Sequence, residues 1–192
     1  DLAPSEHSSH EIIGGTEVPA GELRAVVPMF VLFSGSLCTA AIIGPTYALT
    51  AAHCVYDAPE VEKAVVLIDG VIHNATALHV HPGYGQGDTI IHDIAVIEFS
   101  PATEIEPLLL RRTPVEVGTE AMFAGYGYTT PADADGNFAG QPGTLYQYSE
   151  PIASCATWEA NSGRNLRDYR QFCIPQTDGT GTCSGDSGGP AI

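Results

Sequence analysis

The chain has 192 residues, of which 44% are hydrophobic, and this is enough apolar material for a folded core and argues against intrinsic disorder. Lys and Arg number 7 against 23 Asp and Glu, giving a formal net charge of −16 that disfavours nucleic acid and anionic membranes as partners, since both bind basic surfaces. No apolar run is long enough to span a bilayer, and the N-terminus has no signal-peptide core.

The predicted elements are mostly short strands. Residues 1–11 are polar, without periodicity, and predict a flexible leader. Short apolar or alternating stretches follow, separated by Gly, Pro, Asn and Asp turns. We expect strands at residues 26–33, 40–43, 64–68 and 94–99, short helices after His53 and over residues 151–159, and a long surface loop at residues 128–143. This pattern predicts an all-β barrel or sandwich.

A serine on a glycine-rich turn is the strongest chemical signal. Ser187 lies in the segment 182–190, where glycines flank it and Asp186 precedes it. Glycine permits tight turns and leaves room for a substrate carbonyl to approach the backbone, as an exposed nucleophile requires. His53 and Asp93 lie earlier in the chain, and the three residues together supply a base, an orienting acid and a nucleophile.

The same serine segment also fits a second kind of hydrolase. Residues 185–189 match the G-x-S-x-G nucleophile elbow of α/β-hydrolases. In that fold the acid and the histidine follow the serine in the chain. Only residues 188–192 follow Ser187, so we exclude the elbow interpretation.

From Ile12 to its end, the chain resembles the chymotrypsin-type (trypsin) family of serine proteases, in motifs that keep the family's order and approximate spacing. The matching segments are Ile12-Ile13-Gly14-Gly15, Thr50-Ala51-Ala52-His53-Cys54, His81-Pro82-Gly83-Tyr84, Asp93-Ile94-Ala95-Val96, Gly125-Tyr126-Gly127, Phe172-Cys173 and Gly185-Asp186-Ser187-Gly188-Gly189-Pro190. The resemblance implies an all-β fold of two Greek-key, six-stranded antiparallel barrels. Residues 1–11 would form an activation segment, residues 12–112 the first barrel and residues 113–192 the second.

The resemblance also implies a role for each residue of the site. Ser187 would attack the peptide carbonyl, His53 would take its proton near neutral pH, and Asp93 would hold the imidazole in the required tautomer. The backbone N–H groups of Gly185 and Ser187 would form the oxyanion hole. The alternative is a core histidine, a strand-edge acid and a turn serine that share no chemistry.

Ile12 resembles the new N-terminus that forms when precursors of this family are cut. Its freed ammonium group would pair with the buried carboxylate of Asp186 and order the turn that carries Gly185 and Ser187. Because residues 1–11 are still attached, we expect an inactive precursor. Glu11 precedes the bond, so the activating protease must prefer glutamate or select the apolar residue after the cut, and self-activation is open if the enzyme itself prefers glutamate.

The substrate-binding pocket is only partly encoded in this chain. Gly181 stands where trypsin-like members carry an aspartate that binds Arg and Lys, and Thr182 follows it. Without an acid at its base, the pocket should not favour basic side chains. Thr182 would suit an apolar side chain or a glutamate.

Five cysteines are an odd number. The resemblance pairs Cys38 with Cys54 and Cys155 with Cys173, which implies an oxidising compartment and hence a secreted protein, extracellular or periplasmic. Cys183 would pair with a cysteine beyond Ser187. No such residue follows, and the family's last strands and terminal helix are also missing, so we expect a C-terminally incomplete second barrel. The remainder could be a separate chain, could have been lost, or could be absent from the gene.

Other polar patterns are weaker signals. His79 and His81 share a strand face with His73 nearby, which is compatible with zinc, but His81 begins the structural segment 81–84 and we expect no metal and no cofactor. Residues 133–137 resemble a calcium loop without the required ligand spacing and read as a surface turn. Asn74 begins a glycosylation acceptor, Asn-Ala-Thr, which matters only in a eukaryotic secretory route.

Together these observations predict a secreted serine endopeptidase precursor, activated between Glu11 and Ile12, that hydrolyses proteins or peptides through an acyl-enzyme. Its expected partners are the substrate, an activating protease and a separate C-terminal chain that would supply the partner of Cys183. The alternative is a catalytically silent, protease-like binding or regulatory protein.

Overall fold

The computed structural model describes residues 12–32, 34–56, 61, 64–85, 91–128, 143–156, 171–175 and 180–192. Its largest unit is a closed antiparallel barrel of six strands, in the order β2-β3-β4-β7-β6-β5. The strands are β2 (Val26–Val31), β3 (Ser36–Gly44), β4 (Tyr47–Thr50), β5 (Ala64–Ile68), β6 (Val71–Val80) and β7 (Ala95–Ser100).

The barrel forms because small, β-branched and larger apolar side chains of its strands fill its interior. Phe99, Met29 and Ile42 are at most 1% exposed, and alanines line much of the remaining core. β-Branched residues favour the pleated backbone, and the small alanines let the strands close around the larger side chains. Closure also leaves this sheet without an unpaired edge.

The second sheet has three strands, in the order β1-β9-β8. They are β1 (Thr16–Glu17), β8 (Glu120–Gly125) and β9 (Tyr146–Pro151). Residues 190–192 extend this sheet along β8, because the N–H of Met122 donates to the carbonyl of Ile192 at 2.9 Å and the N–H of Ile192 donates back at 2.8 Å. A smaller core packs on the sheet and consists of Ile12, Ala121, Phe123, Tyr148 and Ile152.

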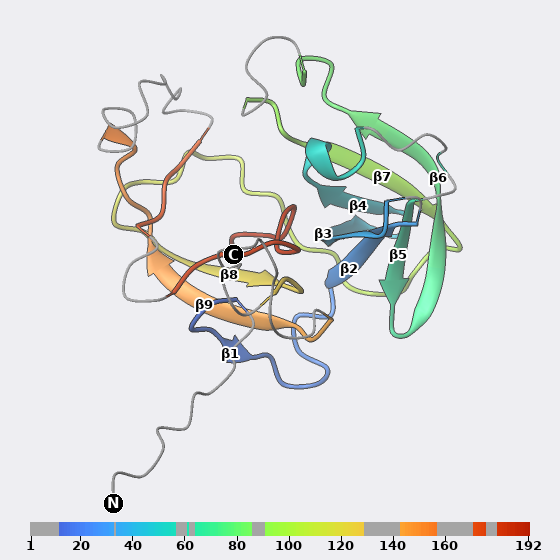
Figure 1. Ribbon diagram of the computed structural model, residues 1–192, viewed down its shortest axis with the longest axis horizontal. Coiled ribbons are helices and arrows are strands. Elements are labelled where there is room, and N and C mark those ends of the chain that lie inside the picture. The colour runs from blue at the N-terminus through green and yellow to red at the C-terminus, as the bar shows by residue number, and fades with distance from the viewer. Residues whose placement is uncertain are drawn as a thin grey trace, which may run out of the picture.

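The two sheets lie side by side, with the C-terminal segment between them (Figure 1). The all-β, chymotrypsin-like prediction is confirmed. In the described residues the second half is a three-stranded sheet extended by residues 190–192, whereas six strands close the first half. β1 pairs with β9, so the chain crosses from the second sheet into the first barrel after Glu17.

The helices differ from their prediction. His53 lies inside a single 3-10 turn, η1 (Ala52–Cys54), and not before it. For the helix expected over residues 151–159, Pro151 belongs to β9 instead, and residues 157–159 lie outside the described residues. Most of the loop expected at residues 128–143 also lies outside them. In the part of the chain that the structure describes, no helix is long and apolar enough to cross a membrane.

Candidate active site

His53 and Asp93 meet at one end of the first barrel. His53 lies on η1 after β4, and Asp93 lies just before β7, which pairs with β4. The Nδ1 atom of His53 lies 2.7 Å from Oδ2 of Asp93, and the backbone N–H of His53 donates to Oδ1 at 2.8 Å. Two bonds to one carboxylate fix both the position and the plane of the imidazole. Nδ1 therefore carries the proton that faces Asp93, and Nε2 is left to act as a base.

His53 and Asp93 change each other's pKa values. The hydrogen bond to Asp93 raises the pKa of His53, and this outweighs the opposing effect of burial. Burial alone would raise the pKa of Asp93, but hydrogen bonds from the His53 ring and from the backbone N–H groups of His53 and Ala52 lower it. The acid therefore stays ionised while the imidazole gains basicity, as a general base near neutral pH requires.

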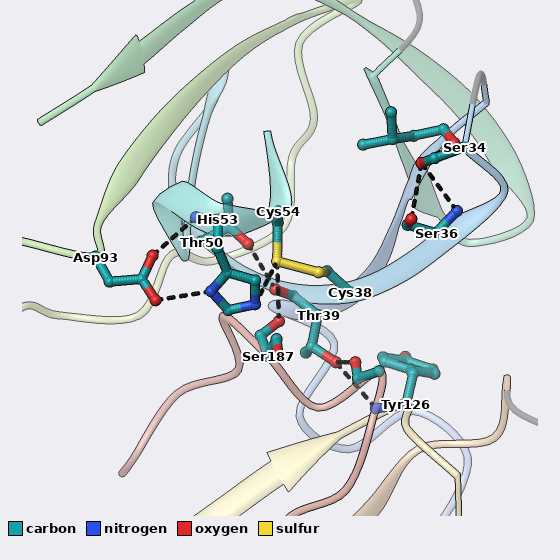
Figure 2. The surroundings of a disulfide bond; sticks show 12 residues. Ser34, Ser36, Cys38, Thr39, Thr50, His53, Cys54, Asp93, Tyr126 and Ser187 are labelled. Carbon is teal, nitrogen blue, oxygen red and sulfur yellow. Dashed lines mark hydrogen bonds and ion pairs between the residues drawn. A yellow bond between two sulfur atoms is a disulfide. The ribbon is translucent and has the colours of Figure 1, made fainter. Parts of the chain in front are cut away.

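Ser187 and the imidazole lie on the same side of the Cys38–Cys54 disulfide. Sγ of Cys54 is 3.7 Å from Nε2 of His53 and 3.8 Å from the carbonyl oxygen of Ser187. Figure 2 shows the ring of His53 with Asp93 on one side and Ser187 on the other. Among the described residues no hydrogen bond joins Oγ of Ser187 to Nε2 of His53. Catalytic hydrogen bonds are often long before substrate binds, so this geometry is compatible with a nucleophile and base.

A buried threonine holds the serine turn against the first barrel. Thr39, on β3, is 0% exposed. Its N–H donates to the carbonyl of Ser187 at 2.8 Å, and its hydroxyl donates to the carbonyl of Gly185 at 2.9 Å. The same hydroxyl accepts from the N–H of Tyr126 at 3.0 Å, and Figure 2 shows this cluster. Sequence reasoning missed Thr39, although a lone polar residue within the apolar stretch of β3 was a usable signal.

Two glycines of the serine turn are required by space and by backbone conformation. Gly185 has φ +99°, and a Cβ there would lie 2.7 Å from Cα of Gly127. Gly188 has φ +83°, and a Cβ there would lie 2.5 Å from the carbonyl oxygen of Thr39. A side chain at either position would strain the backbone and push the turn away from the barrel.

Asp186 is a buried carboxylate held by backbone donors. It is 6% exposed, and it accepts from the N–H groups of Gly127 and Cys183 at 2.8 Å each. Burial raises its pKa to about 6, and the two hydrogen bonds only partly oppose this. A Cβ on Gly127 would lie 2.6 Å from Cγ of Asp186, so any side chain at this position would collide with the buried carboxylate. This is why the Gly125-Tyr126-Gly127 segment ends in a glycine.

Ile12 is already buried in the small core of the second half. Its side chain is 0% exposed. The N–H of Gly181 donates to the carbonyl of Ile13 at 3.0 Å, so the segment after Ile12 is hydrogen-bonded to the residue expected at the base of the pocket. Ile12 has φ +40°, a left-handed conformation that is strained for a β-branched residue. Glu11 lies outside the described residues.

The cysteines and the two expected pocket residues are the remaining predicted positions. Disulfides join Cys38 to Cys54 and Cys155 to Cys173, the pairs that the resemblance implied. Cys183 is half-buried and belongs to neither of the two disulfides found among the described residues. Gly181 is buried and Thr182 exposed.

The histidines considered for zinc have separate partners. His73 donates to the carbonyl of Pro101 at 2.8 Å, His79 lies 2.8 Å from Glu98, and His81 accepts from the N–H of Gly83 at 3.0 Å. In the described residues the only cluster with metal-ligand spacing is Cys38, His53 and Cys54, whose two sulfurs form a disulfide. The calcium-like residues 133–137 lie outside the described part of the chain.

Comparison with known proteins settles the family. The Trypsin family model matches residues 12–192. The chain belongs to the trypsin family of serine proteases. Among curated relatives, brachyurin from Leptuca pugilator is 34% identical over 192 residues, covering 93% of this chain and 80% of that protein. The alpha-fibrinogenase albofibrase from Trimeresurus albolabris is 28% identical and covers 100% of this chain and 76% of that protein.

A solved structure extends the likeness to the fold. Neuropsin, a serine protease expressed in the limbic system of mouse brain, superposes with a TM-score of 0.76 at 23% identity. The match covers 93% of this chain and 81% of that one.

Proposed function

We propose that this trypsin-family chain is the precursor of a serine endopeptidase in which His53, Asp93 and Ser187 form the catalytic triad. The observation that carries the proposal is the doubly bonded His53–Asp93 pair beside the hydrogen-bonded Ser187 turn. Residues 12–112 supply the base and the acid, and residues 113–192 supply the nucleophile.

The reaction follows from this geometry. Nε2 of His53 takes the proton of Ser187 as Oγ attacks the peptide carbonyl, and Asp93 stabilises the imidazolium that forms. The N–H groups of Gly185 and Ser187 bind the oxyanion, and each such donor contributes roughly 3 kcal/mol to transition-state stabilisation. The imidazolium then protonates the leaving amine, and water hydrolyses the acyl-enzyme by the same route.

Activation is proposed to occur by cleavage between Glu11 and Ile12. The new ammonium group would form within the core that already holds the Ile12 side chain, and it would pair with Asp186. A carboxylate whose pKa is raised to about 6 by burial gains most from such a cation. Cleavage would also remove the peptide unit that places Ile12 in a left-handed conformation.

We propose a substrate preference other than Arg or Lys, because a neutral residue, Gly181, stands at the expected base of the pocket. The substrates would be proteins or peptides, and the activating protease would accept Glu11 before the cut. Two disulfides and relatives named as venom proteases, such as snake venom serine protease 1 from Craspedocephalus gramineus, support a secreted protein. A separate C-terminal chain that pairs with Cys183 belongs to the same proposal.

Intact-mass analysis with a fluorophosphonate serine probe tests this function. We expect one probe adduct after cleavage at Glu11-Ile12, much less before it, and none in a Ser187→Ala variant. Ser184→Ala is the matched control, because Ser184 lies on the same turn but is exposed, and it should still be labelled. An absence of labelling after confirmed cleavage would favour the silent, protease-like binding protein instead.

A further inference from the structure

Residues 81–85, here called the bridging turn, lie between the two segments that carry His53 and Asp93. The turn is closed by a hydrogen bond from the N–H of Tyr84 to the carbonyl of His81 at 2.9 Å. It is tied to the acid segment by a hydrogen bond from the N–H of His81 to the carbonyl of Ile94 at 3.0 Å. Ile94 directly follows Asp93.

On the acid side, the bridging turn packs through two histidine rings. His81 and His92 are stacked, with ring centroids 4.4 Å apart and planes inclined by 9°. The N–H of Gly83 fixes the first ring by donating to its Nδ1 at 3.0 Å. A Cβ on Gly83 would lie 2.6 Å from Cδ2 of His92, so the turn fits closely around the second ring.

His92 directly precedes Asp93 and has an unusual backbone. Its φ of +61° is left-handed, which non-glycine residues adopt rarely, although Asn, Asp and His do so more often than others. The N–H of Ile94 donates to the carbonyl of His92 at 2.8 Å, so the chain turns tightly around Asp93. The stack on His81 therefore holds the residue whose backbone aims the Asp93 carboxylate.

On the base side, the same turn packs on η1 through two tyrosines. Tyr84 meets Tyr56 edge to face, with centroids 5.1 Å apart and planes inclined by 73°. The N–H of Tyr56 donates to the carbonyl of Ala52 at 2.8 Å, which ties this ring to the turn that carries His53. A Cβ on Gly85 would lie 3.1 Å from the hydroxyl of Tyr56, so contact here is also close.

We propose that the bridging turn is a positioning device for the catalytic pair: His81 and Tyr84 clamp His92 and Tyr56 and so hold Asp93 at the distance where it accepts both bonds from His53. His92 is the principal positioning residue, since it is adjacent to Asp93. The inference rests on the proposed endopeptidase function. Small errors in the placement of catalytic groups cost large factors in rate, so a contact remote from the substrate can control kcat.

Replacing His92 by Asn separates the stack from the backbone requirement, because Asn tolerates a left-handed φ but offers no imidazole ring. In the cleaved protease, we expect His92→Asn to lower kcat by about tenfold with KM nearly unchanged. The acid limb of the kcat/KM profile should also move to lower pH, because Asp93 would raise the pKa of His53 less. Unchanged kcat and an unchanged acid limb would overturn the proposal.

A second variant and a matched control guard against a general folding defect. Tyr56 is 54% exposed, so Tyr56→Ala should fold, and it should reduce kcat and shift the acid limb in the same direction as His92→Asn. His79→Ala is the control, because His79 is an exposed histidine paired with Glu98 on the outer face of β6, and both readouts should stay at the parent values. An equal shift in His79→Ala would contradict the assigned role.

An NMR titration of His53 in a Ser187→Ala background tests positioning without requiring activity. If the bridging turn positions Asp93, His92→Asn should lower the pKa of His53 in this background, whether or not the parent protein hydrolyses peptides. Suppose that the parent protein showed no Ser187-dependent activity while His92→Asn still lowered the pKa of His53. That result would refute the proposed function and leave the positioning role of the bridging turn supported. An unmoved His53 titration would refute the clamp itself.

Discussion

The two halves of the molecule position the residues of the proposed triad by different means. In the first half a closed barrel surrounds a core in which Phe99 is 1% exposed, and His53 and Asp93 lie at one end of this barrel, after β4 and before β7. In the second half a three-stranded sheet covers a smaller core in which Phe123 remains 8% exposed. Ser187 lies beyond this sheet, on a turn held by hydrogen bonds from Thr39 of the other half.

The proposed base and acid therefore depend on packing within the first half, whereas the proposed nucleophile depends on contact between the two halves. A defect in the barrel core should therefore unfold the protein. A defect at the seam, meaning the contact between Thr39 and the serine turn, should reduce the activity of Ser187 at a smaller cost in stability.

Truncation of matched core phenylalanines tests this comparison most severely. Phe99→Ala should lower the free energy of unfolding by about 3–5 kcal/mol, because the closed barrel cannot collapse around the cavity. Phe123→Ala should cost at least about 1 kcal/mol less, because its more open surroundings can relax. Urea unfolding of both variants followed by circular dichroism measures the difference. Equal losses, or a larger loss for Phe123→Ala, would contradict the distinction between the halves.

Acidification should stabilise the uncut chain through Asp186. Its pKa is about 6 in the folded protein against an ordinary value of 3.8 for an aspartate, so the folded state binds this proton more tightly than the unfolded state. The carboxylate therefore destabilises the fold above pH 6 by up to about 3 kcal/mol, and this penalty fades as pH falls from 6 toward 4. Asp93, whose pKa is lowered, loses its stabilising effect only below that range.

The measurement is urea unfolding at pH 7 and pH 5 for the uncut chain and for Asp186→Asn, which cannot titrate. On acidification, the free energy of unfolding of the parent should rise relative to that of Asp186→Asn. After cleavage at Glu11-Ile12 an ammonium partner would keep Asp186 ionised, so the pH dependence should disappear. Identical pH dependence in cut and uncut protein would speak against the proposed ion pair.

Thr39→Val tests the contact between the two halves. Valine leaves the buried carbonyl of Gly185 and N–H of Tyr126 without their partner, which costs about 1–3 kcal/mol. We expect kcat of the cleaved protease to fall roughly tenfold or more as the oxyanion turn loosens. Thr103→Val is the control, since Thr103 accepts one N–H bond, from Ile105, away from the seam. An equal loss of kcat in the control would show that the effect is not specific to the serine turn.

The sequence predicted much of this architecture, and for a physical reason. Turn residues and apolar alternation are local, so the strands at residues 64–68 and near residues 26–33 and 94–99 were found with small boundary errors. The serine turn and the histidine and aspartate segments were also recognisable, because their chemistry restricts residue types over short spans.

Other features depend on contacts distant in the chain. Thr39 acquires its role only when Gly185 lies 2.9 Å away, and the stack of His92 on His81 depends on the register of strands β6 and β7. The crossing of residues 12–17 to the second sheet likewise follows from pairing between β1 and β9, which no local pattern encodes.

Thr39 also bears on how a cell tolerates a protease during its synthesis. Consider a newly made copy whose first barrel had closed but whose second sheet had not yet docked. Until docking, the carbonyls of Gly185 and Ser187 would lack their hydrogen bonds from Thr39, so the serine turn would be less well ordered even though all three residues of the proposed triad were present. Docking of the two halves would then be a condition for proteolysis, in addition to the proposed cleavage before Ile12.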